Sequence, residues 1–285
     1  LFLLEMGMTA ARHLRGFVEA CAAQYDTALT LTAGWDSRLI AAAAREVHDQ
    51  LGFFTIAAPG SALDQDVAAE LAVRFGLRHR FYPLVRAGPA EQARWDRMVG
   101  HCVCEANRET HPTLGWVPQQ LILTGIYGEP GRARLYRHDA ASINDAPATA
   151  EFVMARLTLP DDADTLASIR AWLAPLDWLP RAAILDLAYV ELKGGSWGMA
   201  QGPVQKAVKW AMMPYAQRAV QHAFMAVSPA DKSSERLFRA VGEQLWPELC
   251  AVPVNSYGDY RDVTSRVVKL FNRERVTRYL RDRLA

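Results

Sequence analysis

Short β-prone segments alternate with helical segments along the N-terminal part of the chain, and this alternation limits the fold more than any other feature. Residues 27–31, 52–57 and 78–84 are bounded, β-prone segments. The two segments between them, 36–47 and 64–75, have helical composition, and Gly76 follows where a helix would end. This order predicts a parallel sheet with right-handed crossovers, and therefore an α/β fold.

The remainder of the chain is predicted to be mostly helical. Residues 6–24 form a helical segment before the first strand, and residues 121–125 read as one further buried strand. Helical periodicity covers 147–158, 162–174, 180–193, 205–224, 233–245 and 262–283. A polar break near residue 145 divides the chain into two parts. Residues 1–145 are expected to form the α/β core, and residues 146–285 a largely helical part that completes it.

Composition excludes several classes of protein. The 285-residue chain is 51% hydrophobic and has a formal net charge of +1. A protein that tracks nucleic-acid phosphates normally has a marked basic excess, so a nucleic-acid partner is not expected. The four cysteines include no CxxC pair, which favours a reducing, cytoplasmic compartment. No apolar run reaches the length of about 18 residues that a membrane span needs, and the opening LFLLEMGM lacks the features of a secretory signal.

The chemistry is predicted to lie in residues 29–38, where a strand passes through a turn of small residues directly into a helix. Ligands of open parallel sheets bind at the carboxyl ends of the strands, and the free N–H groups of a new helix favour an anion there. Ser37 can donate to a phosphate, whereas Asp36 needs a Mg²⁺ ion between its carboxylate and the phosphate. The turn is not a Walker A loop, because it lacks the GK[ST] ending.

The segment Thr32-Ala33-Gly34-Trp35-Asp36-Ser37 resembles the SGGxDS pyrophosphatase loop, or PP-loop, of the adenine-nucleotide α-hydrolase-like superfamily. Asparagine synthetases belong to that superfamily, and the likeness is to their synthetase domain. Thr32 stands for the first serine of the loop and Ala33 for its first glycine. The segment Leu123-Thr124-Gly125-Ile126-Tyr127-Gly128-Glu129 resembles the family's strand that ends in (S/T)G-x-G-(D/E).

The resemblance implies an ATP site with Mg²⁺ as cofactor, in which Asp36 and Glu129 bind the metal from opposite sides. The nucleotide is expected to contact the ends of the strands and the loop, through Leu31, Thr32, Ala33, Gly34, Asp36, Ser37, Thr55, Ile56, Thr124 and Gly125. Residues 64–79 resemble the family's D-x-x-x-A…G-x-x-H stretch. Asp64 and Asp66 in that stretch suit a helix N-cap equally well.

The departures from the family concern nitrogen supply and positive charge. The family's glutaminase domain and its cysteine nucleophile are not found in this sequence, so nitrogen is expected from ammonia, from an amine of the substrate or from a partner subunit. The family also uses a lysine to neutralise the departing pyrophosphate. Lys232 is the nearest match, Glu235 is an alternative occupant of that position, and the other candidates are Lys193, Lys206 and Lys209.

Arg38 falls in the first turn of the loop helix and is a further candidate for catalysis. Its guanidinium could contact a phosphate or a substrate carboxylate with two parallel hydrogen bonds. The alternative is an ion pair with Asp64 or with another acid at the surface.

The leading interpretation is a ligase that adenylates a small-molecule carboxylate, releases pyrophosphate and forms an amide with a nitrogen nucleophile. Two alternatives remain open. One is a PP-loop enzyme that modifies tRNA bases, with Cys102 or Cys104 as nucleophile and the basic residues of 262–283 on the RNA. The other is a nucleotide-binding subunit without turnover, which the relaxed loop and the uncertain lysine favour.

Overall fold

A computed structural model describes residues 1–99, 105–198 and 208–264, and within them five parallel strands form one sheet in the order β3-β2-β1-β4-β5. The strands are β1 (Thr27–Thr30), β2 (Gly52–Ala57), β3 (His79–Pro83), β4 (Leu121–Leu123) and β5 (Trp210–Met212). The predicted fold class, a parallel α/β core with a largely helical part, is thereby confirmed.

Helices of very different length surround this sheet. The α-helices are α1 (Phe2–Gln24), α2 (Trp35–Ala43), α3 (Ala62–Phe75), α4 (Pro89–Val99), α5 (Glu105–Thr110), α6 (Ala150–Leu157), α7 (Ala163–Leu173), α8 (Arg181–Ala188), α10 (Arg218–Ala226), α11 (Pro229–Ser233), α12 (Arg236–Leu245) and α13 (Pro247–Cys250). The short 3₁₀ helices are η1 (Arg45–Gln50), η2 (His111–Trp116), η3 (Glu129–Arg132), η4 (Arg137–Asp139), η5 (Ala174–Leu176) and η7 (Pro214–Ala216), and η6 (Tyr189–Gly198) is a π-helix. In the part of the chain that the structure describes, no helix combines the length and the apolar character that crossing a membrane requires.

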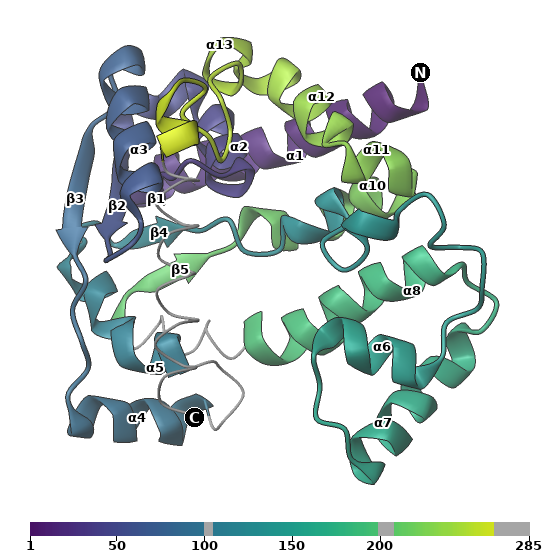
Figure 1. The fold of residues 1–285 in the computed structure, drawn as a ribbon. Coiled ribbons are helices and arrows are strands. Elements are labelled where there is room, and N and C mark those ends of the chain that lie inside the picture. Colours follow the sequence, from purple (N-terminus) through teal and green to yellow (C-terminus); the bar gives the residue numbers. More distant parts are fainter. Residues whose placement is uncertain (100–104, 199–207, 265–285) are drawn as a thin grey trace.

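The sheet separates two layers of helices (Figure 1). Helices α1, α2, α3, α12 and α13 lie on one face, and α4 and α5 lie on the other. The first layer encloses the largest hydrophobic cluster, in which Leu14 of α1, Leu39 of α2 and Phe238 of α12 are fully buried. Helices α6, α7 and α8 form a separate group with its own cluster around Val153 and Leu185.

The central strand, β1, pairs with β2 on one side and with β4 on the other. Three of its four residues are buried, as expected for a strand covered on both faces. Its next residue, Leu31, donates its N–H to the carbonyl of Phe54 at 2.8 Å. The carboxyl ends of β1, β2 and β4 therefore meet at one edge of the sheet, and the loop that follows β1 starts there.

Two of the helices predicted from periodicity differ in the structure. The segment 205–224 is not one helix in its described part, because Trp210–Met212 forms β5 beside β4 and α10 begins only at Arg218. Pro214 cannot continue a helix, and the open edge of β4 supplies the hydrogen bonds that make a strand. The predicted helix 36–47 ends at Ala43 and continues as η1. The predicted helix 262–283 and the first residues of 205–224 lie largely outside the described residues.

The helical part is not packed as a single unit beside the sheet. The largest hydrophobic cluster takes Val220, Phe224 and Leu237 from the second half of the chain together with the helices of the first half. Strand β5 also comes from the second half and joins the sheet. The division near residue 145 stays a prediction, and the segment with a cluster of its own is 133–188.

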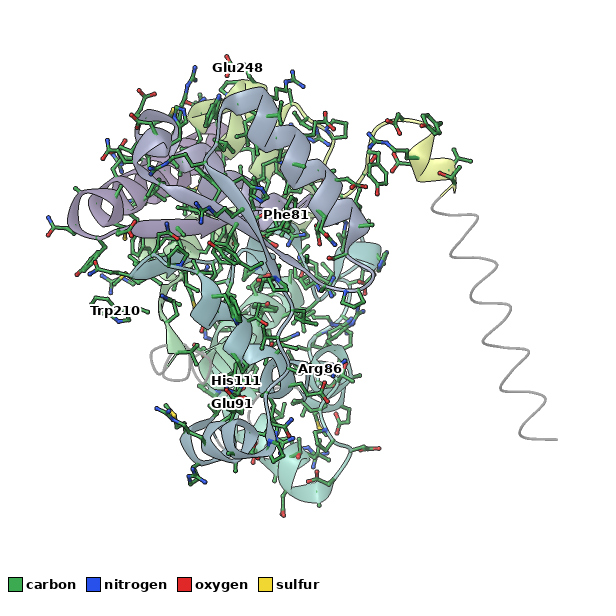
Figure 2. The ribbon with its side chains drawn as sticks, turned by 90° about the vertical axis from the view of Figure 1, so that its left-hand side faces the viewer. Phe81, Arg86, Glu91, His111, Trp210 and Glu248 are labelled. Carbon is green, nitrogen blue, oxygen red and sulfur yellow. The ribbon has the colours of Figure 1, made fainter. Side chains whose placement is uncertain are left out.

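The two outer strands of the sheet each carry a partly exposed aromatic residue, and both are labelled in Figure 2. Phe81 in β3 is 44% exposed, and Trp210 in β5 is 39% exposed. The Trp210 ring meets Tyr25 edge-on, with 5.3 Å between the ring centroids. Trp210, the first residue of β5, lies at the edge of the sheet opposite the loop after β1.

Candidate functional site

The loop between β1 and α2 is closed by its own hydroxyl groups. The N–H of Thr32 donates to Ser37 Oγ at 3.0 Å, and the N–H of Gly34 donates to Thr32 Oγ1 at 3.3 Å. The two hydroxyl oxygens lie 2.7 Å apart. Backbone N–H groups at the start of a helix are the donors that bind anions in proteins. In this structure, the side-chain oxygens of Thr32 and Ser37 occupy positions that phosphate oxygens could take.

Asp64 orients the middle of the loop. Its Oδ1 accepts a hydrogen bond from the N–H of Ala33 at 2.9 Å. Ser61 is the N-cap residue of α3, so the interpretation of Asp64 and Asp66 as N-caps is wrong. Asp66 instead accepts a hydrogen bond from the hydroxyl of Tyr257 at 3.0 Å. The carboxylates at the start of α3 thus hold neighbouring backbone and side-chain groups in place.

Asp36 and Glu129 are partly buried and follow two adjacent strands. Asp36 is the second residue of α2 after β1, and Glu129 begins η3 after β4. Burial raises the pKa of Asp36 to about 7, while Arg132 opposes this shift and Glu129 adds to it. Asp36 Oδ1 and Glu129 Oε2 are buried and have no hydrogen-bond partner among the described residues. Leaving such oxygens without a donor is costly, and a hard cation would satisfy both.

Two glycines make room for Asp36. A Cβ atom on Gly125 would lie 2.7 Å from Asp36 Cβ, and one on Gly128 would overlap Asp36 Oδ1. Between them, Tyr127 has the left-handed φ of 76°, which is uncommon for a residue other than glycine. The hydroxyl of Tyr127 donates to the carbonyl of Gly194 at 2.7 Å, which secures this conformation. The turn after β4 therefore brings Glu129 towards Asp36 only because residues 125 and 128 lack side chains.

The carboxylates of Asp36 and Glu129 suit Mg²⁺, which needs only one or two ligands from the protein. They suit less well a metal whose ligands are all protein side chains. The described residues include no cluster of three or more His, Cys, Asp or Glu side chains that could hold a metal. Mg²⁺ commonly binds one or two carboxylates and completes its shell with water and substrate phosphates. Asp36 and Glu129 could hold Mg²⁺ in this way beside a nucleotide in the adjacent loop.

Tyrosine hydroxyl groups contact both acidic residues. Tyr189 forms a hydrogen bond with Glu129, and burial followed by the charge of Glu129 raises the pKa of Tyr189 well above its usual range. The hydroxyl of Tyr215 donates to the backbone carbonyl of Asp36 at 2.9 Å. Gln221 in α10 donates to the carbonyls of Tyr127 and Tyr215 at 2.9 and 2.8 Å. Elements from both halves of the chain therefore hold this site.

The remaining predicted nucleotide contacts meet at the same edge of the sheet. Thr55 donates its hydroxyl to the carbonyl of Leu31 at 2.6 Å and lies 2.8 Å from His79 Nε2, so its side chain is already engaged. Ile56 follows it and is half-buried. The hydroxyl of Thr124 is buried without a hydrogen-bond partner in the described structure. Leu31, Thr55 and Ile56 therefore offer a ligand backbone atoms more readily than polar side chains.

Arg38 does not face a ligand, contrary to the expectation from its sequence position. Its side chain is fully buried. The guanidinium donates to the carbonyls of Val252, of Pro253 at 2.9 Å and of Ala33 at 3.3 Å. These bonds join the loop to a segment near the end of the chain. We therefore assign Arg38 a positioning role in place of phosphate or substrate contact.

Lys232 is also removed from the loop. It is 1% exposed, and its Nζ lies 2.5 Å from Asp186 Oδ2 and 3.4 Å from the hydroxyl of Tyr136. This ion pair joins α11 to α8, so Lys232 is already neutralised and cannot reach pyrophosphate without leaving a buried carboxylate unpaired. The expected catalytic role for Lys232 is replaced by a structural one.

The other lysines lie in different surroundings. Lys193 Nζ lies 5.5 Å from the ring centroid of Tyr189, the residue that bonds Glu129, so Lys193 is near the site. Lys209 precedes β5 and lies at the opposite edge of the sheet, because Trp210 pairs with the first residue of β4. Lys206 lies outside the described residues, as do Cys102, Cys104 and nearly all of 262–283.

Glu235 lies beside the loop helix. Its Oε2 accepts from Trp35 Nε1 at 2.9 Å, and its Oε1 accepts from Arg137 at 2.8 Å. Trp35 is the variable residue of the loop motif, so Glu235 is joined to the loop through the indole. Glu235 therefore adds a negative charge beside the first turn of α2.

Arg132 contacts the candidate site, and the sequence interpretation missed it. It forms an ion pair with Asp36 through Nη2 and Oδ2, and Arg134 is close enough to lower the pKa of Asp36 as well. Both lie shortly after Glu129, in the run Gly131-Arg132-Ala133-Arg134. Two arginines just after a predicted metal-binding carboxylate were a usable signal in the sequence.

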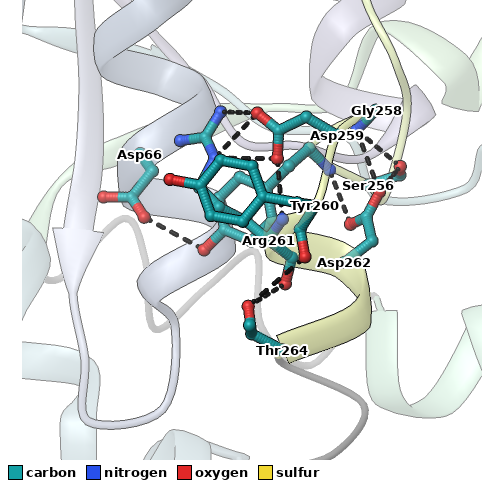
Figure 3. A network of polar contacts seen from close by, with 9 residues as sticks. Asp66, Ser256, Gly258, Asp259, Tyr260, Arg261, Asp262 and Thr264 are labelled. Atoms are coloured by element: carbon teal, nitrogen blue, oxygen red, sulfur yellow. Dashed lines mark hydrogen bonds and ion pairs between the residues drawn. The ribbon is translucent and has the colours of Figure 1, made fainter.

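A segment near the end of the described chain packs on the loop. The N–H of Asn255 donates to the carbonyl of Ala33 at 2.9 Å. Figure 3 shows the neighbouring network, in which Asp262 accepts from the N–H groups of Tyr257 and Gly258 at 2.8 and 2.9 Å. Because Tyr257 also bonds Asp66, residues 252–262 are attached to both the loop and the first turn of α3.

A cavity of about 510 Å³ lies at the opposite edge of the sheet. It is lined by Gly52 and His79, the first residues of β2 and β3, and by Gln119 before β4. Ligands of parallel sheets bind at the carboxyl ends of the strands, so we place the site at the loop and not in this cavity. No known protein family matches the chain, and no curated protein is significantly similar to it. Its function is therefore inferred from the geometry of the site.

Proposed function

We propose that this chain binds Mg–ATP at the loop between β1 and α2 and uses it to adenylate a small-molecule carboxylate for amide formation. The observation that carries the proposal is a pair of buried oxygens, Asp36 Oδ1 and Glu129 Oε2, beside a loop rich in N–H and hydroxyl groups. Neither oxygen has a hydrogen-bond partner in the part of the chain that the structure describes. A divalent cation and a polyphosphate together satisfy these groups, because the cation takes the carboxylates and the phosphates take the donors.

In the proposed reaction, a carboxylate oxygen of the substrate attacks the α-phosphorus of ATP. The bond from that phosphorus to the β-phosphate oxygen breaks, and pyrophosphate leaves. An amine or ammonia nitrogen then attacks the acyl carbon, the bond to AMP breaks, and the nitrogen loses a proton. The small-molecule amine, free ammonia or a partner subunit would supply this nitrogen.

The residues of the chain act mainly by positioning and by charge. Thr32, Ser37 and the loop N–H groups would hold the departing pyrophosphate once their mutual hydrogen bonds open. Mg²⁺ bound by Asp36 and Glu129 would neutralise the charge that develops on it. Lys193, which lies over Tyr189, is the expected lysine that remains near the site. Such preorganised charge is usually the largest contribution to a reaction of this type.

The proposal is tested by calorimetric titration with α,β-methylene-ATP, which cannot be split between the α- and β-phosphates. We expect binding to depend on Mg²⁺ and to weaken by about tenfold or more in Asp36→Asn and Glu129→Gln. Asp66→Asn is the matched control, because its carboxylate lies near the loop but bonds Tyr257. Binding that does not depend on Mg²⁺, or that is unchanged in both variants, would contradict the proposed site.

A nucleotide-binding subunit without turnover is the second candidate, and the buried positions of Lys232 and Arg38 favour it. A screen of carboxylates for pyrophosphate release separates the two. Release that requires both a carboxylate and an amine supports the ligase. Mg²⁺-dependent binding of the analogue without release, across a panel of carboxylates and amines, supports the subunit.

A further inference from the structure

Among the described residues, two of the cations expected at a departing pyrophosphate, Lys232 and Arg38, are bound to other groups of the protein. Lys232 is paired with Asp186 inside the fold, and Arg38 is committed to three backbone carbonyls. Glu235 brings a negative charge beside Trp35 instead. Lys193 remains near the site, and a further cation among the described residues, Arg132, contacts Asp36 directly.

Arg132 is close enough to supply positive charge to a polyphosphate. It ends η3, the short helix that Glu129 begins, so one element carries both a proposed metal ligand and this arginine. Its guanidinium pairs with Asp36, and its side chain is 15% exposed. Arg132 thus lies beside the carboxylate of Asp36, next to the loop that would bind phosphate.

The contacts of Arg132 divide into a fixed part and an exchangeable part. The guanidinium carbon lies 5.6 Å from the ring centroid of Phe238, and that ring stacks parallel to Tyr215 in the core. This aromatic support does not depend on Asp36. The ion pair, in contrast, is made with Asp36 itself. Arg132 Nε has no hydrogen-bond partner among the described residues. The guanidinium can therefore change its anionic partner while its stem stays in place.

We propose that Arg132 neutralises Asp36 while no metal is bound and becomes a ligand of the pyrophosphate group once a divalent cation takes Asp36. A divalent cation on Asp36 and Glu129 removes the attraction that holds the guanidinium and repels it. The planar guanidinium matches phosphate oxygens and can donate two parallel hydrogen bonds to them. This inference rests on the proposed Mg–ATP site, and it assigns to Arg132 a phosphate contact that was expected of Lys232.

The test measures two bindings that should change in opposite directions. In Arg132→Gln, we expect Mn²⁺ alone to bind about tenfold more tightly, because no guanidinium competes for Asp36. We expect Mg²⁺–pyrophosphate to bind about tenfold or more weakly, because the phosphate ligand is lost. Mn²⁺ binding is followed by its electron paramagnetic resonance signal, and pyrophosphate binding by calorimetry.

Two further variants keep the outcome interpretable. Arg156→Gln is the matched control, because it removes another partly exposed arginine from an ion pair, with Asp139, and should change neither binding. Arg132→Lys keeps the charge and should recover part of the pyrophosphate binding. Weaker Mn²⁺ binding in Arg132→Gln, or pyrophosphate binding equal to that of the parent, would overturn the inference.

The outcome is separable from that of the proposed function. If the parent binds α,β-methylene-ATP with Mg²⁺ but Arg132→Gln leaves pyrophosphate binding unchanged, the nucleotide site is supported and the role of Arg132 is contradicted. If Arg132→Gln shows the two opposite changes while no carboxylate supports turnover, Arg132 keeps its role and the ligase proposal falls.

Discussion

At the scale of single residues, the acidic residues of the site could be predicted from the sequence, whereas the surroundings of its cationic residues could not. Asp36 lies in the turn itself, so its place follows from the strand–turn–helix pattern around it. Two of the three carbonyls that Arg38 bonds are 214 and 215 residues away, and the acid that pairs with Lys232 is 46 residues away. Whether a long cationic side chain faces a ligand or the core depends on such distant partners. A motif of six residues contains no information about them.

The buried pair of Lys232 and Asp186 leads to a prediction about pH. Burial raises the pKa of Asp186 to about 6, and Lys232 is the strongest influence in the opposite direction. In Lys232→Met, the folded-state pKa of Asp186 should therefore rise further. A folded protein that retains a proton released by the unfolded chain loses stability as pH increases. We expect Lys232→Met to be about 3–5 kcal/mol less stable than the parent at pH 8 and closer to it at pH 5.

Urea unfolding at the two pH values measures this difference. The double variant Lys232→Met/Asp186→Leu removes both charges and should lose the additional pH dependence. An equal loss of stability at pH 5 and pH 8 in Lys232→Met would show that Asp186 does not titrate in this range.

At the scale of elements, the turn after β4 does more than connect a strand to a helix. Its glycines accept the side chain of Asp36, its tyrosine has a left-handed backbone, and its last residue is Glu129. The glycine spacing could be predicted from the sequence, because a small residue is needed wherever another backbone approaches closely. The left-handed Tyr127 could not, because its conformation is secured by Gly194, which lies 67 residues further along the chain.

Gly128→Ala should disable this turn while leaving the fold intact. The added Cβ would overlap Asp36 Oδ1, so Asp36 must move away from Glu129. We expect Mg²⁺-dependent binding of α,β-methylene-ATP to fall about tenfold or more, with a loss of stability of about 1–3 kcal/mol. Calorimetry and urea unfolding measure the two effects.

Gly195→Ala is the control for that substitution, because a Cβ there has nothing within 4 Å. It should bind the analogue as the parent does. If Gly128→Ala also binds it normally, the proximity of residue 128 to Asp36 has no functional consequence.

The elements themselves show where sequence patterns suffice. The segments around β1, β2 and β3 could be predicted because each is a short β-prone segment between turn residues. Strand β5 was missed because Trp210, Ala211 and Met212 suit the apolar repeat of a helix as well as that of a strand. Only pairing with β4 makes them a strand. Its position beside β4 is a property of the whole sheet and not of those three residues.

At the scale of the whole molecule, the site depends on both ends of the described chain. The first turn of α2 is held by Arg38 to Val252 and Pro253, and the carbonyl of Ala33 also accepts from Asn255. The same cluster of buried side chains contains residues of α1 and of α12. The α/β core and the later helices therefore share one hydrophobic cluster beside the loop.

Arg38→Lys should release residues 252–255 from the loop. Lysine keeps the charge but cannot donate to three separate carbonyls in the geometry of a guanidinium. We expect the amide of Asn255 to exchange its hydrogen about tenfold faster or more, together with the amides of the loop. Hydrogen–deuterium exchange of peptides that cover 30–40 and 250–258 measures this coupling.

Arg261→Lys serves as the control, because Arg261 forms a more exposed pair with Asp259 in the same region. It should leave exchange in the loop unchanged. Faster exchange at 250–258 alone in Arg38→Lys would mean that the loop holds its shape without the later segment.

The attachment of Arg38 to Val252 has a consequence for the order in which the protein is made. The ribosome adds Val252 214 residues after Arg38, which takes roughly 10–40 s at about 5–20 residues per second. During that time the β1–α2 turn exists on the nascent chain without the carbonyls that Arg38 will bind. A newly made chain can therefore attach this turn to its later segment only after Val252 and Pro253 have been synthesised.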